Sequence, residues 1–150
     1  MSNLTIEELS AATIVAVNRL GLKPGQEQFI TPVSYAAAAA VTPPDSAWQR
    51  VILQDGRVVA FIHGNFDPNA AHEEFRAALW RINVDADAQG AGVGTFAVQA
   101  LIEEARRRGV GRLTVLWERG EDGPEEFFLH MGFKPVGETP YDEVIGAIEL

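Results

Sequence analysis

The chain has 150 residues, a formal net charge of −9 and no cysteine. This length fits one domain, residues 1–150, that can bury a core without disulfides or a structural metal. The acidic balance argues against a protein that follows nucleic-acid phosphates, because such proteins present a basic surface. It mildly favours a cationic small-molecule partner, although acidity of this size also serves solubility.

The same composition limits the cellular compartments and the catalytic groups that we expect for this protein. The lack of cysteine excludes disulfides, thiolate metal ligands and a cysteine nucleophile. No apolar run approaches the roughly 20 residues of a membrane helix, and residues 1–8 lack the basic-then-apolar pattern of a signal peptide. We therefore expect a cytoplasmic protein with no membrane partner and no nucleic-acid partner.

The amino-terminal part of the chain predicts one strand and two helices. Apolar and polar residues alternate at 4–9, which predicts a short strand. Ser10 is a candidate cap for a helix that runs to about Leu20. A second helix is expected to begin near Ser34 and to end before the prolines at 43 and 44.

The middle of the chain predicts a hairpin followed by a central strand. Apolar runs at 48–53 and 58–63 are separated by turn-forming residues that include Asp55 and Gly56, a pattern typical of a β-hairpin. Residues 75–84 predict another strand, in which the alternation of apolar and polar side chains is imperfect.

The second half of the chain predicts an amphipathic helix between strands. From 92 to 108 the apolar residues recur at helical spacing, and Gly109 ends the helix. The remaining elements are a strand at 112–117, a short helix at 124–131, and strands at 133–136 and 144–150. This order predicts a mixed α/β domain with a crossover at its centre.

A glycine-rich loop precedes the amphipathic helix and is the most informative segment of the chain. Its sequence is Gln89-Gly90-Ala91-Gly92-Val93-Gly94. Glycines let a ligand approach the backbone closely, and the start of a helix directs free N–H groups and a positive dipole end toward an anion. The loop therefore predicts a ligand that carries phosphate.

Two familiar phosphate loops do not fit this segment. The Walker pattern requires Gly-Lys-Ser/Thr, whereas this chain has Gly94 followed by Thr95. The dinucleotide pattern G-x-G-x-x-G, begun at Gly90, would place its third glycine at Thr95, and the loop does not follow a first strand. The pattern that fits is Q-x-x-G-x-G, beginning at Gln89.

This Q-x-x-G-x-G segment resembles the pyrophosphate loop of the GNAT acetyltransferases. Flanking segments that also resemble the family lie at 81–85, 130–133, 137–138 and 142–144. Within the superfamily, the pattern is similar to that of bacterial spermine/spermidine (diamine) acetyltransferases. The resemblance covers the last half of the chain closely and the first half only in the order of elements.

The resemblance implies the GNAT fold, a mixed, mostly antiparallel sheet flanked by helices, and an acetyl-CoA-dependent N-acetyltransferase activity without a metal. It implies that the backbone of Ile82, Asn83 and Val84 binds the pantetheine arm like an added strand. The residues expected to hold the pyrophosphate are Gln89, Gly90, Ala91, Gly92, Val93, Gly94 and Thr95. A homodimer is the expected oligomer, because GNAT proteins are frequently dimers.

In this family a primary amine attacks the acetyl thioester directly, which requires a base for its proton. Candidate bases are Glu73 and Glu74, before the central strand, and His63, at the end of the hairpin. Each of them also fits an ordinary surface or hydrogen-bonded role. Many GNAT enzymes carry a tyrosine as general acid where this chain has Phe128, which cannot donate a proton and is expected to contact the cofactor.

The expected acceptor is a small primary amine, and polyamines are the leading class. A protein amine or an aminoglycoside would suit the same scaffold, as would a non-catalytic acyl-CoA-binding sensor with a closed or inert acceptor pocket. Acidic residues that could attract a cationic amine are Glu118, Glu121, Asp122, Glu125 and Glu126. For Glu125 and Glu126, support of the helix dipole from the first turn is the simpler role.

Overall fold

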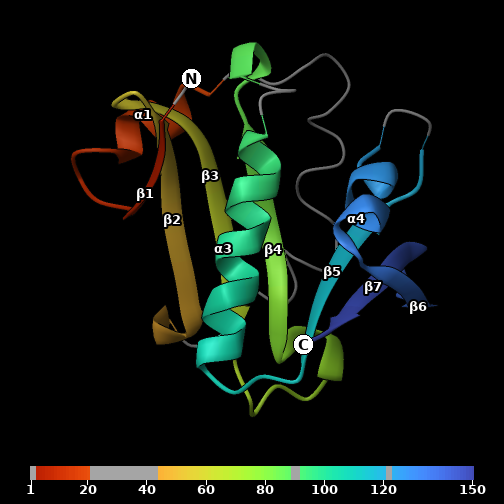
Figure 1. The fold of residues 1–150 in the computed structure, drawn as a ribbon. Coiled ribbons are helices and arrows are strands. Elements are labelled where there is room, and N and C mark those ends of the chain that lie inside the picture. The colour runs from red at the N-terminus through yellow and green to blue at the C-terminus, as the bar shows by residue number, and fades with distance from the viewer. Residues whose placement is uncertain (1–2, 21–43, 89–91, 121–122) are drawn as a thin grey trace.

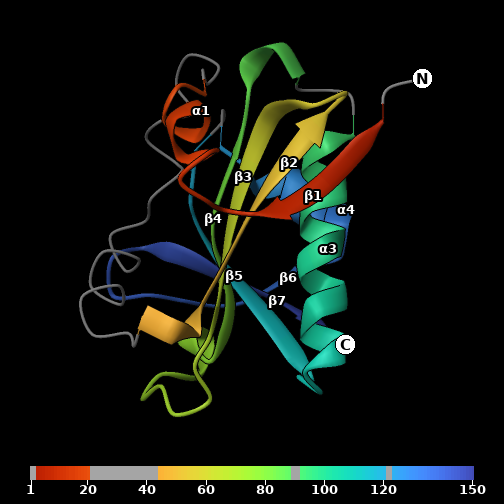
Figure 2. The same ribbon diagram turned by 90° about the vertical axis from the view of Figure 1, so that its left-hand side faces the viewer.

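The computed structural model describes residues 3–20, 44–88, 92–120 and 123–150. Its strands form one seven-stranded sheet in the order β1-β2-β3-β4-β5-β7-β6. Helices α3 and α4 cover one face of this sheet, and the short helix α1 lies on the opposite side (Figures 1 and 2). The expected architecture, a mixed and mostly antiparallel sheet flanked by helices, is confirmed.

The amino-terminal side of the sheet is an antiparallel meander. Strand β1 (Leu4–Glu8) pairs with β2 (Ala47–Gln54), which pairs with β3 (Arg57–Phe66). The turn between β2 and β3 consists of Asp55 and Gly56, whose φ angles are 52° and 87°. Two consecutive positive φ values match the type I′ turn, which follows the natural twist of a hairpin. The predicted hairpin is therefore confirmed, with longer strands.

The first predicted helix is wrong in its extent. Helix α1 spans only Ile14–Asn18, and its N-cap is Thr13 rather than Ser10. The Ser10 side chain contacts the Thr13 hydroxyl at 3.2 Å instead of capping a helix amide. Residues 11–13 consequently form a turn. The second predicted helix, from Ser34, lies outside the described residues.

Strand β4 (Ala77–Val84) contains an irregularity that explains its imperfect alternation. It pairs antiparallel with β3, and His63 lies opposite Arg81 while the next residue, Gly64, lies opposite Leu79. Trp80 is thus an extra residue on β4, which is the definition of a β-bulge. A bulge bends its strand and increases the local twist, so β4 changes direction at Trp80.

The crossover expected at the centre of the chain joins β4 to β5 (Arg112–Glu118) through α3 (Val93–Arg107). The two strands are parallel, which requires such a helical connection. They are paired at only two positions, Ala78 with Thr114 and Leu79 with Val115. Past these pairs, where β4 bends at its bulge, the sheet splits into two arms, as the gap between β4 and β5 in Figure 1 indicates.

The carboxyl-terminal side of the sheet is built on the second arm. Strand β5 pairs antiparallel with β7 (Glu143–Glu149), and β7 pairs with the edge strand β6 (Lys134–Glu138). Helix α4 (Glu125–Met131) connects β5 to β6. Pro124 occupies its N-cap position and not the first helical position that the sequence predicted.

The core lies between the sheet and α3. The buried face of α3 consists of Val93, Ala97, Val98, Leu101, Ile102 and Ala105. Beneath Leu101 the sheet carries Gly64, where an added Cβ would lie 2.5 Å from a Leu101 methyl group. No helix in the described ranges is long and apolar enough to cross a membrane.

Candidate active site

Within the described residues, the split between β4 and β5 leaves β4 unpaired with β5 beyond Leu79. On its other edge, β4 pairs with β3 over seven positions, up to the pair of Ala60 with Val84. Toward β5, the ladder of the described strands ends at Leu79. Where two strands of a sheet part, backbone N–H and C=O groups can pair with an extended ligand as with an added strand. The residues predicted to bind pantetheine, 82–84, lie on this stretch.

Helix α3 begins beside the split with a backbone conformation that favours glycine. Gly92 is its N-cap, with φ of 78°, and makes no side-chain capping hydrogen bond. The first turn contains no acidic residue. The amides of this turn and the positive end of a 15-residue helix therefore form an environment that favours an anion. The preceding residues of the motif, Gln89 to Ala91, lie outside the described residues.

Three elements meet at Gly94 in the first turn of α3. A Cβ added to Gly94 would lie 3.3 Å from the Phe127 ring of α4 and 3.7 Å from a Val84 methyl group of β4. The predicted cofactor residues on β4 and α3 are thus brought together, and α4 closes the group from the β5 side. Glycine at 94 lets the three elements approach closely.

Phe128, the residue at the position of the family's tyrosine, belongs to an aromatic cluster. It is 4% exposed, and its ring is stacked on Trp117 with centroids 5.5 Å apart. Phe127 and Phe133 contact Phe128 edge to face, at 5.3 and 5.9 Å. The buried indole N–H of Trp117 donates a hydrogen bond to Glu125 at 2.8 Å.

His63 lies at the level of the split, on the strand next to β4. Its register partner is Arg81, two residues beyond the last β4–β5 pair, and its ring lies 5.4 Å from that of Trp80. Burial, together with the nearby positive charge of Arg81, lowers the pKa of His63 below the ordinary 6.5. The imidazole is therefore neutral at pH 7, the form that accepts a proton.

Comparison with known proteins decides the family. The profile described as Acetyltransferase (GNAT) family matches residues 16–133. The chain belongs to this family. It is an acetyl-CoA-dependent N-acetyltransferase by family and fold. A comparison with curated protein sequences finds no significant match.

Solved structures share the fold of this GNAT chain at low sequence identity. The ribosomal-protein-S18-alanine N-acetyltransferase of Escherichia coli is 22% identical, with a TM-score of 0.67 over 98% of this chain and 94% of that one. The PaiA N-acetyltransferase of Thermoplasma acidophilum, solved with coenzyme A, is 11% identical, with a TM-score of 0.71 over 99% of each chain. An aminoglycoside 6′-N-acetyltransferase, also with coenzyme A, is 17% identical, with a TM-score of 0.67 over 97% and 96%.

Glu73 and Glu74, the other predicted bases, lie at the opposite end of β4. They belong to a short 3₁₀ helix, Glu73–Phe75, just before the strand begins. Glu73 lies 3.7 Å from Arg112 at the start of β5, and the backbone carbonyl of Glu74 accepts a hydrogen bond from the Thr114 hydroxyl. Val84 is the last of the strand's eight residues, at the other end from the two glutamates. The GNAT structure therefore groups His63 with the split and places the two glutamates apart from it.

The predicted acidic cluster is divided among several roles. Glu125 and Glu126 lie in the first turn of α4, as predicted, and Glu125 also holds the Trp117 indole. Glu118 ends β5 and is partly exposed. Glu121 and Asp122 lie outside the described residues. Sequence reasoning missed the indole contact, although a tryptophan in a buried strand signals a donor that needs a partner.

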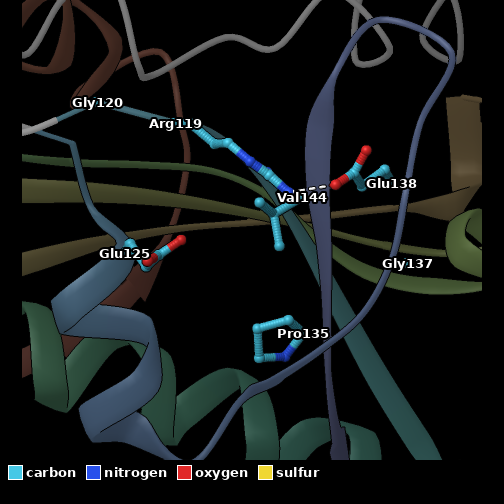
Figure 3. A pocket seen from close by; sticks show the side chains of 7 residues that line it. All are labelled: Arg119, Gly120, Glu125, Pro135, Gly137, Glu138 and Val144. Carbon is cyan, nitrogen blue, oxygen red and sulfur yellow. Dashed lines mark hydrogen bonds and ion pairs between the residues drawn. The ribbon is translucent and has the colours of Figure 1, made fainter.

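A cleft of about 480 Å³ opens between α4 and the β6–β7 hairpin (Figure 3). It is lined by Arg119, Gly120, Glu125, Pro135, Gly137, Glu138 and Val144. Arg119 and Glu138 form an ion pair across it. The cleft is on the β7 side of β5, whereas the split is on its β4 side.

Among the described residues, no group of His, Cys, Asp or Glu is arranged to hold a metal ion.

Proposed function

We propose that acetyl-CoA binds across the split, with pantetheine along 82–84 of β4 and the pyrophosphate at 89–95. The single observation that carries this proposal is the convergence of β4, α3 and α4 at Gly94, at the end of β4 where the described strands show no β4–β5 pair beyond Leu79. The GNAT neighbours solved with coenzyme A support it. Calorimetric titration of the protein with acetyl-CoA tests it, and absence of binding would contradict it.

The proposed reaction is direct transfer of the acetyl group within a ternary complex. The amine nitrogen attacks the thioester carbon, a backbone amide of β4 polarises the carbonyl oxygen, and the C–S bond breaks. The proton leaves the amine nitrogen for the base. Because a free thiol has a pKa of roughly 8.5, coenzyme A can depart as a thiolate although Phe128 offers no proton.

For the base we propose His63 in preference to Glu73 and Glu74. Its support is its place beside the split and a lowered pKa that keeps the imidazole neutral at pH 7. Both glutamates lie at the far end of β4, next to Arg112 and Thr114. A rate profile against pH tests this choice, since an essential His63 makes the rate fall as the pH drops through its lowered pKa.

The proposed acceptor is a small primary amine, with a polyamine as the leading class. The net charge of −9 favours a cationic acceptor through its long-range field. Relatives of similar fold act on an aminoglycoside and on a ribosomal-protein alanine, so these two classes are the alternatives. A panel of spermidine, a neutral amine of similar size, an aminoglycoside and a peptide with N-terminal alanine tests the ranking by coenzyme A release.

A second candidate function is a non-catalytic acyl-CoA sensor. The observation that favours it is Phe128, a buried residue without a hydroxyl at the position of the family's acid. A sensor would bind acetyl-CoA with normal affinity and transfer acetyl to none of the amines in the panel.

A homodimer and a cytoplasmic location are further proposals from the resemblance. Light scattering after size exclusion tests the homodimer.

A further inference from the structure

Helix α4 spans the two arms of the split sheet. On the β5 arm it is attached through Trp117, whose ring is stacked on Phe128 and whose indole N–H donates to Glu125. On the other arm, the ring of Phe127 lies against Gly94 of α3, beside Val84 of β4. Because the strands share no pairs past Leu79 and Val115 in the described chain, α4 supplies the contact between the arms at the level of the proposed pyrophosphate site.

Trp117 is held in one place by its surroundings. It is fully buried, and its ring fills the space that a side chain at Gly146 of β7 would occupy, with an added Cβ only 2.4 Å away. The indole therefore cannot move toward β7. Glu125, by contrast, lies on the exposed first turn of α4 and lines the open cleft of Figure 3. The fixed indole thus holds the exposed carboxylate, and through it the start of the helix.

We propose that Trp117 and Glu125 are positioning residues for the acyl-CoA site. Their hydrogen bond sets where α4 begins on β5, and two residues later the same helix places Phe127 against Gly94. The bond thereby sets the distance between the β5 arm and the first turn of α3. This inference rests on the proposed binding of acetyl-CoA at that turn.

The chain offers a matched control for the test. Glu126 is the next residue, is exposed, and lies in the same first turn, so Glu126→Ala removes the same charge from the helix dipole without touching the indole. Glu125→Gln retains a carbonyl oxygen that can accept from the indole, whereas Glu125→Ala retains none. The three variants separate the hydrogen bond from the charge.

The experiment measures acetyl-CoA affinity by calorimetry at a temperature where circular dichroism shows every variant folded. We expect Glu125→Ala to weaken acetyl-CoA binding roughly fivefold to tenfold. This corresponds to part of the free energy of one charge-assisted hydrogen bond. Glu125→Gln should stay within about twofold of wild type, and Glu126→Ala should be unchanged. In a steady-state assay in which the acceptor amine is varied, the KM of Glu125→Ala for the amine should equal that of wild type.

A double-mutant cycle completes the test. Trp117→Phe keeps an aromatic ring and removes the donor, so Glu125→Ala should have no further effect on affinity in that background. If Trp117→Phe does not fold, the Glu125 series alone decides. Equal affinities of Glu125→Ala and wild type, with only a lower melting temperature, would overturn the positioning role. Wild-type protein that binds no acetyl-CoA would overturn the proposed function itself.

Discussion

The two edges of β4 carry the same backbone groups but pair with neighbouring strands to different extents. One edge forms seven register pairs with β3, and β5 likewise forms seven with β7 on its far side. Between them, β4 and β5 share two pairs. Each strand is thus anchored firmly on its outer edge, which leaves the inner edges apart without loss of the sheet. A hydrogen-bonded ladder that ends early between two strands can therefore leave room for a ligand between them.

The cause of the difference is local. The extra residue Trp80 turns β4 at the point where pairing with β5 ends. Helix α3 packs over β3 and β4 on that arm, whereas α4 is attached to β5 through Trp117.

The largest effect is expected at Gly146, on the anchored β5–β7 edge. An added Cβ would lie 2.4 Å from the Trp117 ring, which is fully buried and cannot yield easily. Gly146→Ala should lower the free energy of unfolding by about 3 kcal/mol, in the upper range for overpacking. Gly111→Ala is the control, since nothing lies within 4 Å of its added Cβ. Equal urea midpoints for the two variants would show that the β5 arm is not tightly anchored.

Removal of the proposed base should slow acetyl transfer by roughly 10²-fold in His63→Gln. Burial lowers the pKa of His63, so the wild-type rate should be constant at pH 7 and fall as the pH drops below 6.5 through that lowered pKa. The same shift makes the folded protein lose stability over that acidic range, because unfolding frees an imidazole that binds protons more readily. A wild-type rate that falls at no pH below 6.5 at which the protein stays folded would remove His63 from the mechanism.

A negative charge at the start of α3, beside the split, should weaken acetyl-CoA binding. Gly92 has φ of 78°, which asparagine and aspartate both tolerate better than most residues, so the pair Gly92→Asn and Gly92→Asp isolates charge from backbone strain. We expect Gly92→Asp to bind roughly tenfold to thirtyfold more weakly than Gly92→Asn, because its carboxylate repels the pyrophosphate. Calorimetry compares the two, and equal affinities would place the pyrophosphate elsewhere.

The smallest effect is expected when the missing acid is restored. Phe128→Tyr should raise the single-turnover rate severalfold below pH 8, where a departing thiolate gains most from a proton donor. The added hydroxyl should cost about 1–2 kcal/mol of stability, because it enters an aromatic cluster that is 4% exposed at this residue. Phe128→Leu is the control for lost stacking. A rate that is unchanged across pH 6 to 9 would contradict the prediction.

The sequence predicted the elements whose patterns are local. The hairpin around Asp55 and Gly56 and the helix after Gly92 follow from turn chemistry and from apolar spacing, and both are confirmed with small shifts at their ends. Helix α1 is much shorter than predicted, because Ser10 and Thr13 bond to each other in a turn. Local competition of this kind is hard to read from propensity alone.

The arrangement of the candidate site depends on contacts between separate elements, which no short stretch of sequence reveals. The place of His63 beside Arg81 requires the register of two strands, and the approach of Phe127 to Gly94 requires the packing of α4 on β5. The Glu125 bond to Trp117 joins residues from separate elements. Only the imperfect alternation of β4 carried a sequence signal of the bulge, and it did not reveal the split.

The most direct test of the central claim is amide hydrogen exchange with and without saturating acetyl-CoA. If pantetheine replaces the missing strand, exchange should slow by about tenfold or more across 80–84 of β4 and in the first turn of α3 at 92–96. Residues 60–63 of β3, already paired with both β2 and β4, should keep their rates. Slower exchange confined to other regions, with none at 80–84, would contradict the account.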